Sequence, residues 1–181
     1  MEKSIFLAGI GGQGMQSVGK SLIQAGDKIG LTVSYSPLYT FEKRGGLSSA
    51  YVVFTDKKEV GSPRKEKHDI VVVMENNTFQ YSKNDVVNGG TLVVHSSMVK
   101  DISGVNEGIQ VKEAPFLSVA SDLGNTKVLS TVVLGYVAAL SGLFEDLSVV
   151  KNQALESLKK KPDLLKLNEI AFDKGVELAN S

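Results

Sequence analysis

Hydrophobic positions along the chain form short apolar runs that alternate with segments of helical spacing. The runs of strand length cover residues 4–8, 31–36, 47–55, 70–74, 91–95 and 108–113. The segments of helical spacing cover residues 13–29, 128–141, 148–159 and 162–179. Because strand-length and helix-length patterns alternate, the sequence predicts an α/β protein rather than an all-helical or all-β one.

The same pattern predicts how the sheet is built. Residues 70–74 are a continuous apolar run, which is typical of a central parallel strand covered on both faces. Pro37 is expected to end the second strand, because proline cannot donate a ladder hydrogen bond. The glycine-containing stretch 88–90 is expected to form a turn that precedes the strand over 91–95.

One hairpin is expected on this sheet. The strand over 47–55 reaches a tight turn at 56–58, and a short return follows at 59–60. With the helical C-terminal third, these elements predict one three-layer α/β/α domain over residues 1–181, with a mainly parallel sheet that carries the hairpin.

The composition narrows the classes of function. The 181 residues include 20 basic and 20 acidic side chains, so no net charge draws the chain to nucleic acid or to an anionic membrane. The sequence has no cysteine, which excludes disulfides, cysteine-held zinc, iron–sulfur clusters and a thiol nucleophile in this chain. His68 and His95 stand far apart and outside any ligand-spaced cluster, so no metal site is expected.

The N-terminus and the most apolar stretch bear on location. The first strand begins at once, without the basic stretch and cleavage site of a signal peptide. The most apolar stretch, 128–144, contains serines, a threonine and glycines and is shorter than the ~20 residues of a membrane span. We therefore expect a cytoplasmic protein in which this stretch is a helix buried in the core or at a subunit interface.

The chain carries its clearest motif directly after the first strand. Residues 5–14 read Ile-Phe-Leu-Ala-Gly-Ile-Gly-Gly-Gln-Gly, so that Gly9, Gly11 and Gly14 form a G-x-G-x-x-G pattern, with Gly12 and Gln13 inside it. Glycine permits a sharp strand-to-helix turn, and the helix N-terminus that follows attracts phosphate or carboxylate. The alternative is a close crossing of helix and strand without a ligand.

Two common nucleotide sites fit this motif poorly. A nicotinamide dinucleotide site requires an acidic residue at the end of the second strand, where this chain has Ser34-Tyr35-Ser36-Pro37. Asp27 is nearer the expected spacing but falls in the helix. The sequence also lacks the Lys-Ser/Thr pair that a P-loop places after its last glycine.

A second group of candidate residues lies in the loop over 39–46. It contains Tyr39, Glu42, Arg44, Gly45 and Gly46, between two strands and at a position where α/β sheets commonly build sites. Arg44 could clamp a carboxylate or phosphate with its planar guanidinium, and Glu42 could orient that guanidinium. The alternative is a solvated turn with one local ion pair.

Taken together, these motifs resemble the gamma subunit, or gamma domain, of the 2-oxoacid:ferredoxin oxidoreductases, most closely the 2-oxoglutarate type. The resemblance rests on several stretches of the chain. They are the Gly-x-Gly-Gly-Gln-Gly turn, the Tyr-x-x-Glu-x-Arg-Gly-Gly loop, Asp69 before a valine-rich strand, Leu123-Gly124-Asn125, Leu134-Gly135, and Asn-Glu-Ile-Ala-Phe-Asp-Lys-Gly over 168–175. The chain departs from the family at Ser130-Thr131, where asparagine is common, and at Thr40 and Phe41, where small residues are usual. The 2-oxoacid therefore stays open.

The resemblance implies a place in a larger enzyme. Such complexes decarboxylate a 2-oxoacid oxidatively on thiamine diphosphate with magnesium, pass electrons through iron–sulfur clusters to ferredoxin, and release an acyl-coenzyme A. Alpha, beta and ferredoxin-like delta subunits hold the thiamine diphosphate and the clusters, so this chain itself would bind none of these cofactors. No residue of the chain is assigned a catalytic role, and the isolated chain is expected to be inactive and to tend to self-dimerise.

The resemblance also suggests which residues lie next to the active site of the complex. We hypothesise that the glycine turn, Arg44 and the basic segment 64–67 help to bind coenzyme A. The candidate residues are Gly9, Gly11, Gly12, Gln13, Gly14, Tyr39, Glu42, Arg44, Gly45, Gly46 and Asn125. Two alternatives remain open: the beta chain of an indolepyruvate ferredoxin oxidoreductase, and a free-standing nucleotide- or flavin-binding domain.

Overall fold

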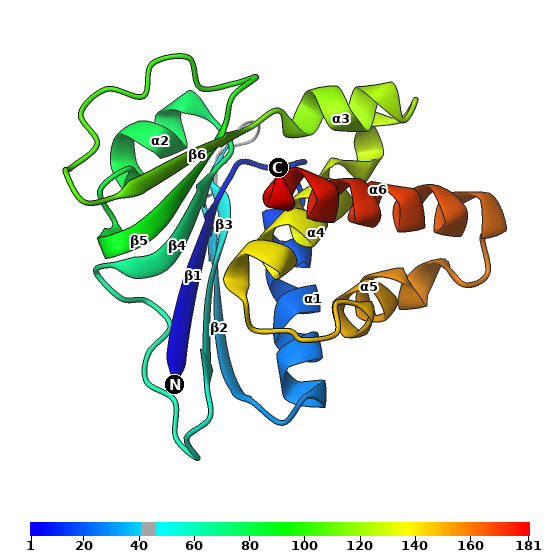
Figure 1. Ribbon diagram of the computed structural model, residues 1–181, viewed down its shortest axis with the longest axis horizontal. Helices are drawn as coiled ribbons and strands as arrows, with labels where there is room; N and C mark the ends of the chain where they lie inside the picture. Colours follow the sequence, from blue (N-terminus) through cyan, green and yellow to red (C-terminus); the bar gives the residue numbers. More distant parts are fainter. Residues whose placement is uncertain (41–45) are drawn as a thin grey trace.

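The computed structural model describes residues 1–40 and 46–181, and within them a mixed six-stranded sheet forms the centre of the molecule (Figure 1). Its strands, in spatial order, are β2 (Thr32–Tyr39), β3 (Ser48–Thr55), β1 (Glu2–Ala8), β4 (His68–Val73), β5 (Val86–His95) and β6 (Gln110–Ala114). The β1–β4, β4–β5 and β5–β6 pairs are parallel, whereas β3 is antiparallel to both β1 and β2. The predicted α/β class is confirmed.

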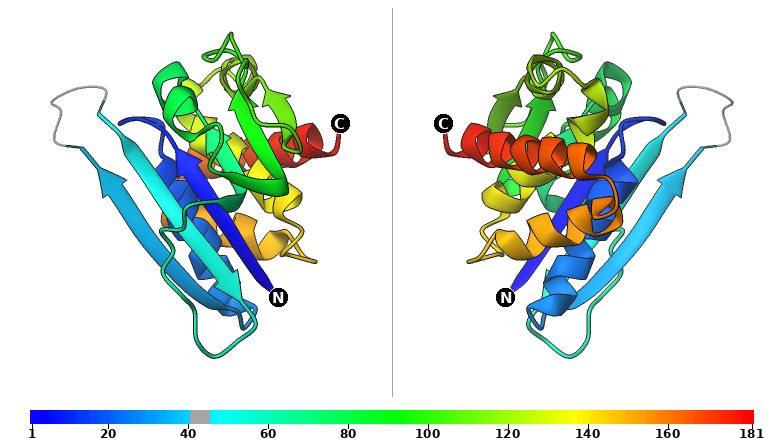
Figure 2. Two further views of the ribbon diagram at one scale, coloured as in Figure 1. Left: turned by 90° about the vertical axis from the view of Figure 1, so that its left-hand side faces the viewer. Right: turned by 90° about the vertical axis from the view of Figure 1, so that its right-hand side faces the viewer.

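Helices cover the two faces of the sheet unequally. The helices are α1 (Met15–Lys28), α2 (Asn76–Ser82), α3 (Phe116–Asp122), α4 (Leu129–Ser141), α5 (Ser148–Leu155) and α6 (Pro162–Asn180), with 3-10 turns at Thr126–Val128 and Glu156–Leu158. Helices α1, α4, α5 and α6 form a thick layer on one face, and α2 lies on the other (Figures 1 and 2). The three predicted layers are present, but one of them is thin.

The hairpin of the sheet is formed by different residues from those predicted. The antiparallel neighbours of β3 are β2 and β1, and residues 59–60 form no strand.

Strand β2 also continues past Pro37 to Tyr39, because Pro37 lies on the edge of the sheet. Within the β2–β3 ladder, the Thr40 N–H donates to the Leu47 carbonyl, so by alternation the backbone groups of Pro37 point away from β3, where no N–H is required.

The predicted turn at 88–90 is wrong, since these residues lie within β5. Gly89 has a φ of 78°, and its N–H donates to the Gly108 carbonyl. A side chain on Gly90 would meet the carbonyl of Asp69 at 2.9 Å. The two glycines therefore lie within β5, where they permit a positive φ and a close approach to β4, and they do not end the strand.

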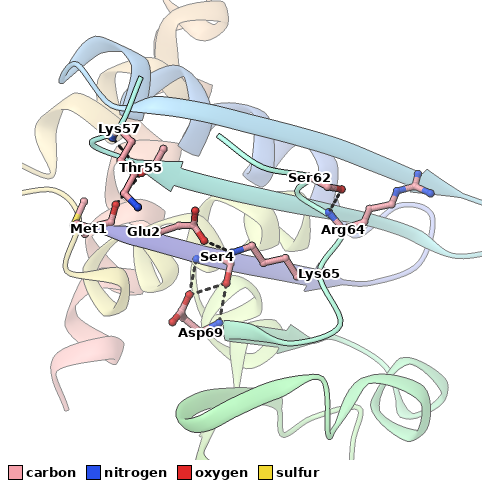
Figure 3. A network of polar contacts seen from close by, with 9 residues as sticks. All are labelled: Met1, Glu2, Ser4, Thr55, Lys57, Ser62, Arg64, Lys65 and Asp69. Atoms are coloured by element: carbon pink, nitrogen blue, oxygen red, sulfur yellow. Dashed lines mark hydrogen bonds and ion pairs between the residues drawn. The ribbon is translucent and has the colours of Figure 1, made fainter. Parts of the chain in front are cut away.

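The segment between β3 and β4 is tied to the sheet by polar contacts (Figure 3). Lys65 forms an ion pair with Glu2, and the Arg64 guanidinium donates to the Ser36 hydroxyl at 2.9 Å and to the Pro37 carbonyl at 3.2 Å. The Asp69 carboxylate accepts from both the N–H and the hydroxyl of Ser4, each at 2.7 Å. These contacts fix the entry into β4 beside β1.

The apolar stretch that begins near residue 128 forms a buried helix, as predicted. Side chains of α4 are buried over most of its length, and α4 packs against α6 through two glycines. A Cβ on Gly135 would lie 2.1 Å from the Phe172 carbonyl oxygen, and one on Gly175 would lie 2.0 Å from the Val132 carbonyl oxygen. The two backbones therefore touch at a crossing that admits no side chain. None of the helices in the described parts of the chain is long and apolar enough to span a membrane.

Candidate functional site

The glycine turn lies where the sheet topology changes direction. After β1 the chain leads to β2 and β3 on one side, whereas β4 and β5 lie on the other side of β1. Helix α1 follows β1 on one face, and α2 follows β4 on the opposite face. In open α/β sheets, ligands bind outside the carboxyl ends of the strands at such a point. The candidate site is therefore the edge of the sheet formed by Gly9–Gly14, the start of α2 and the ends of the 39–46 loop, which we call the glycine edge.

Most backbone donors of the glycine turn bind other protein groups. The N–H of Gly9 donates to the Ser49 hydroxyl (3.2 Å), that of Ile10 to Gln13 Oε1 (3.0 Å), that of Gly11 to the Gly46 carbonyl (3.0 Å) and that of Gln13 to the Ile10 carbonyl (3.2 Å). Among the described residues, the N–H groups of Gly12 and Gly14 have no such partner. The first turn of α1 has no side-chain cap and no acidic residue. Any anion would therefore bind at Gly12, Gly14 and the start of α1.

Two glycines of the motif are also required by packing. A Cβ on Gly9 would lie 2.6 Å from Met15 Cγ, and one on Gly14 would lie 2.7 Å from Ser130 Cβ. Gly14 in addition has a φ of 76°, and Gly12 a φ of 95°. The close crossing considered from the sequence is thus part of the structure, at the contacts of β1, α1 and α4.

Gln13 joins the two helix starts across the crevice. Its Oε1 accepts from the Ile10 N–H, while its Nε2 donates to Glu75 Oε1 at 3.1 Å and to the Met74 carbonyl at 3.4 Å. Glu75 precedes α2, so a carboxylate lies at the junction of β1 and β4. This charge opposes an anion at both helix starts, and most strongly at α2, where Glu75 lies.

Replacing Gln13 with alanine is expected to lower the free energy of unfolding by about 1–2 kcal/mol, because the Ile10 N–H and the Met74 carbonyl lose a partner. Denaturant unfolding monitored by circular dichroism measures the change. Gln110→Ala, on exposed β6, is the matched control and is expected to change stability by less than about 0.5 kcal/mol. Equal effects of the two variants would contradict a bridging role for Gln13.

The structure brings the ends of the second predicted group to the glycine turn. Gly46 is buried and accepts from the Gly11 N–H, and Leu47 forms a β-bridge with Ile10. Tyr39 ends β2 with 61% of its surface exposed. Glu42, Arg44 and Gly45 lie outside the described residues. The two candidate groups, 34 residues apart at Gly12 and Gly46, therefore share one edge of the sheet.

The sequence candidate Asn125 and the histidine His95 have local structural roles. The Asn125 side chain accepts from the Lys127 N–H at 3.0 Å and so begins the 3-10 turn before α4. His95, at the end of β5, is buried, and its Nδ1 lies 3.3 Å from the Ala114 carbonyl oxygen. Burial lowers the pKa of His95, which keeps the ring neutral. Neither residue makes a hydrogen bond to the glycine turn in the described structure.

The other histidine is buried between aromatic rings. His68 is 1% exposed, and its ring centroid lies 5.6 Å from that of Phe6 and 5.5 Å from that of Tyr51. Neither ring nitrogen has a hydrogen-bond partner among the described residues. Burial lowers the pKa of His68 to about 4, although the Lys65 carbonyl and the Asp69 charge act in the opposite direction. Within the same described residues, no three His, Asp or Glu side chains are grouped as metal ligands.

Comparison with known proteins places this chain in an oxidoreductase family. The family described as pyruvate ferredoxin/flavodoxin oxidoreductase matches residues 4–178, and the chain belongs to this family. The resemblance predicted from the motifs is thereby confirmed. The 2-oxoglutarate synthase subunit KorC of Methanocaldococcus jannaschii is 30% identical over 185 residues, which cover 99% of this chain and 95% of that subunit.

The chain corresponds to only part of other relatives. Ketoisovalerate oxidoreductase subunit VorA of Methanothermobacter thermautotrophicus is 34% identical over 147 residues, which cover 80% of this chain and 30% of VorA. This chain thus spans about a third of the length of VorA.

Solved structures share the fold. The gamma subunit of a keto/oxoacid ferredoxin oxidoreductase from Geobacter sulfurreducens has a TM-score of 0.82 at 24% identity, with 99% of this chain and 97% of that chain covered. The 2-oxoglutarate:ferredoxin oxidoreductase from Magnetococcus marinus, with 2-oxoglutarate, coenzyme A and succinyl-CoA bound, has a TM-score of 0.89 at 23% identity, with 99% and 31% covered.

Proposed function

We propose that this chain is the gamma-type subunit of a 2-oxoacid:ferredoxin oxidoreductase that acts on 2-oxoglutarate, and that residues 1–181 form one gamma-type domain. The observation that carries the proposal is the near full-length match to KorC, a subunit of 2-oxoglutarate synthase, within a matched oxidoreductase family. The reaction is the oxidative decarboxylation of the 2-oxoacid to an acyl-coenzyme A, with ferredoxin as the electron acceptor.

The proposal leaves the redox chemistry to partner subunits. As the family resemblance implies, alpha, beta and ferredoxin-like delta subunits in the cytoplasm would hold the thiamine diphosphate, the magnesium and the iron–sulfur clusters. The composition agrees for the clusters, which cysteine thiolates hold, because this sequence has no cysteine. The role of this chain is to complete the complex beside the active site.

We further propose that coenzyme A contacts this chain at the glycine edge. An anion such as a coenzyme A phosphate is supported by three features: the N–H groups of Gly12 and Gly14, which have no partner among the described residues, the uncapped start of α1, and the nearby ends of the loop that contains Arg44. The proposal does not include Arg64 and Lys65 of the basic segment 64–67, because both already bind groups of this chain.

Replacing Arg44 with alanine in the complete complex is expected to raise the KM for coenzyme A about 10-fold or more, as loss of a charged hydrogen bond to phosphate predicts. The KM for the 2-oxoacid should not change. Arg64→Ala is the control, because Arg64 is the other arginine of the chain and binds β2. An unchanged KM for coenzyme A would remove this chain from the coenzyme A site but leave its role as a subunit intact.

A further inference from the structure

A cavity of about 200 Å³ opens on the α2 face of the sheet, directly beside the glycine turn. Its apolar walls are Phe6 and Ala8 of β1, Leu38 of β2 and Leu47. Ser82, at the end of α2, and Asp85, in the turn before β5, supply polar groups to the same cavity. None of the helices in the described residues lies over β2 and β3 on this side of the sheet (Figure 2).

The polar groups of the cavity differ in whether they already have partners. The Ser49 hydroxyl is bound to the backbone of Gly9, and the Thr78 hydroxyl to the backbone of Glu75. By contrast, the Ser82 hydroxyl and the Asp85 carboxylate form no hydrogen bond or ion pair among the described residues. Within residues 1–40 and 46–181, the cavity therefore combines apolar walls with acceptor oxygens that have no partner.

The electrostatics of the cavity favour a cation. Burial raises the pKa of Asp85, and the charge of Asp85 in turn contributes to the raised pKa of Tyr51. Of the charged groups in the described residues, Lys67 lowers the pKa of Asp85 and Glu66 raises it. A carboxylate that is partly desolvated and unpaired is stabilised most by a cationic donor brought against it.

The rim of the cavity has the composition of a protein interface. Tyr81 lines it with 79% of its surface exposed, and Tyr39, next to Leu38, is 61% exposed. Tyrosines are enriched at interfaces, where arginine side chains that enter pockets often serve as anchors. Lysine and arginine combine an apolar stem with a cationic head, which matches these walls and this carboxylate.

We propose that this cavity receives a lysine or arginine side chain of a partner subunit, with its stem against Phe6 and Leu38 and its cationic head on Asp85 and Ser82. The inference rests on the proposed function, which makes this chain part of a complex. It assigns the α2 face beside the glycine turn as a subunit interface.

The test uses Asp85→Asn, with Asp27→Asn, at an exposed position of α1, as the matched control. In the isolated full chain, Asp85→Asn should raise Tm by about 2–4 °C, because a half-buried charge with no ion-pair partner among the described residues is removed. In titrations of the chain against its purified partner subunits, the same variant should raise the apparent Kd about 10-fold or more. The Kd of the variant should also depend less on salt concentration than that of the unchanged chain. The control should change neither quantity.

Each contrary result has a distinct meaning. A lower Tm for Asp85→Asn would show that a cation of this chain already fills the cavity, and an unchanged Kd would show that the partners do not use Asp85; either result overturns the inference alone. Micromolar binding of n-butylammonium by the isolated chain would identify a small-amine site instead. If the unchanged chain retains no partner subunit at all, the proposed function fails together with this inference.

Discussion

Replacing Gly135 with alanine is expected to destabilise the protein by about 3 kcal/mol or more, because overpacking at a rigid backbone contact costs at least as much as in a packed core. The new methyl group would lie 2.1 Å from the Phe172 carbonyl oxygen, so α4 and α6 would have to separate. Both helices belong to the main core. Chemical denaturation of the full chain measures the loss as a lower unfolding midpoint.

The control for this variant is Gly61→Ala. Gly61 has no heavy atom within 4 Å of an ideal Cβ among the described residues, and its φ is not in the left-handed region. Its replacement should change the free energy of unfolding by less than about 0.5 kcal/mol. If Gly135→Ala were tolerated as well as Gly61→Ala, the close α4–α6 crossing would be refuted.

Replacing His68 with phenylalanine is expected to reduce the loss of folding stability at acid pH. The folded protein keeps His68 neutral down to about pH 4, whereas the unfolded chain binds a proton near the ordinary pKa of 6.5. Stability is therefore undiminished above pH 6.5 and falls as the pH drops from 6.5 to 4, by on the order of 2 kcal/mol from this one ring. The phenylalanine ring keeps the contacts with Phe6 and Tyr51 without titrating.

Unfolding free energies measured between pH 7.5 and 4.5 test this expectation. His68→Phe should show a shallower decline than the unchanged protein, and Tyr51→Phe should keep the full decline because it retains both the ring stack and His68. Parallel curves for His68→Phe and the unchanged protein would mean that His68 takes up its proton equally in the folded and unfolded states.

Much of the fold could be predicted because its signals are local. The continuous apolar run of β4, the strand–glycine–helix sequence of β1 and α1, and the long C-terminal helices all lie within single stretches of sequence. Helices α2 and α3 have seven residues each, too few for an apolar period to repeat. The choice of β2 as the partner of β3 depends on pairing between segments, which no local pattern states.

The candidate site was predictable as two separate motifs but not as one edge. The hydrogen bond between Gly11 and Gly46 joins them, and such contacts depend on the order of strands in the sheet. Glu75 carried no signal in the sequence, because its contact with Gln13 spans 62 residues. The motif predicted close approach at Gly9, Gly11 and Gly14. The structure shows it at Gly9, against Met15, and at Gly14, against Ser130, whereas no described atom lies within 4 Å of a Cβ on Gly11.

The central claim is that this chain acts as a subunit of a 2-oxoacid:ferredoxin oxidoreductase. The most direct measurement is purification of the tagged chain from its native cells, followed by dye reduction dependent on both coenzyme A and a 2-oxoacid, with several 2-oxoacids compared. The account predicts co-purified thiamine diphosphate and iron–sulfur subunits and highest activity with 2-oxoglutarate. A lone monomer that carries a bound nucleotide or flavin, without 2-oxoacid activity, would contradict it.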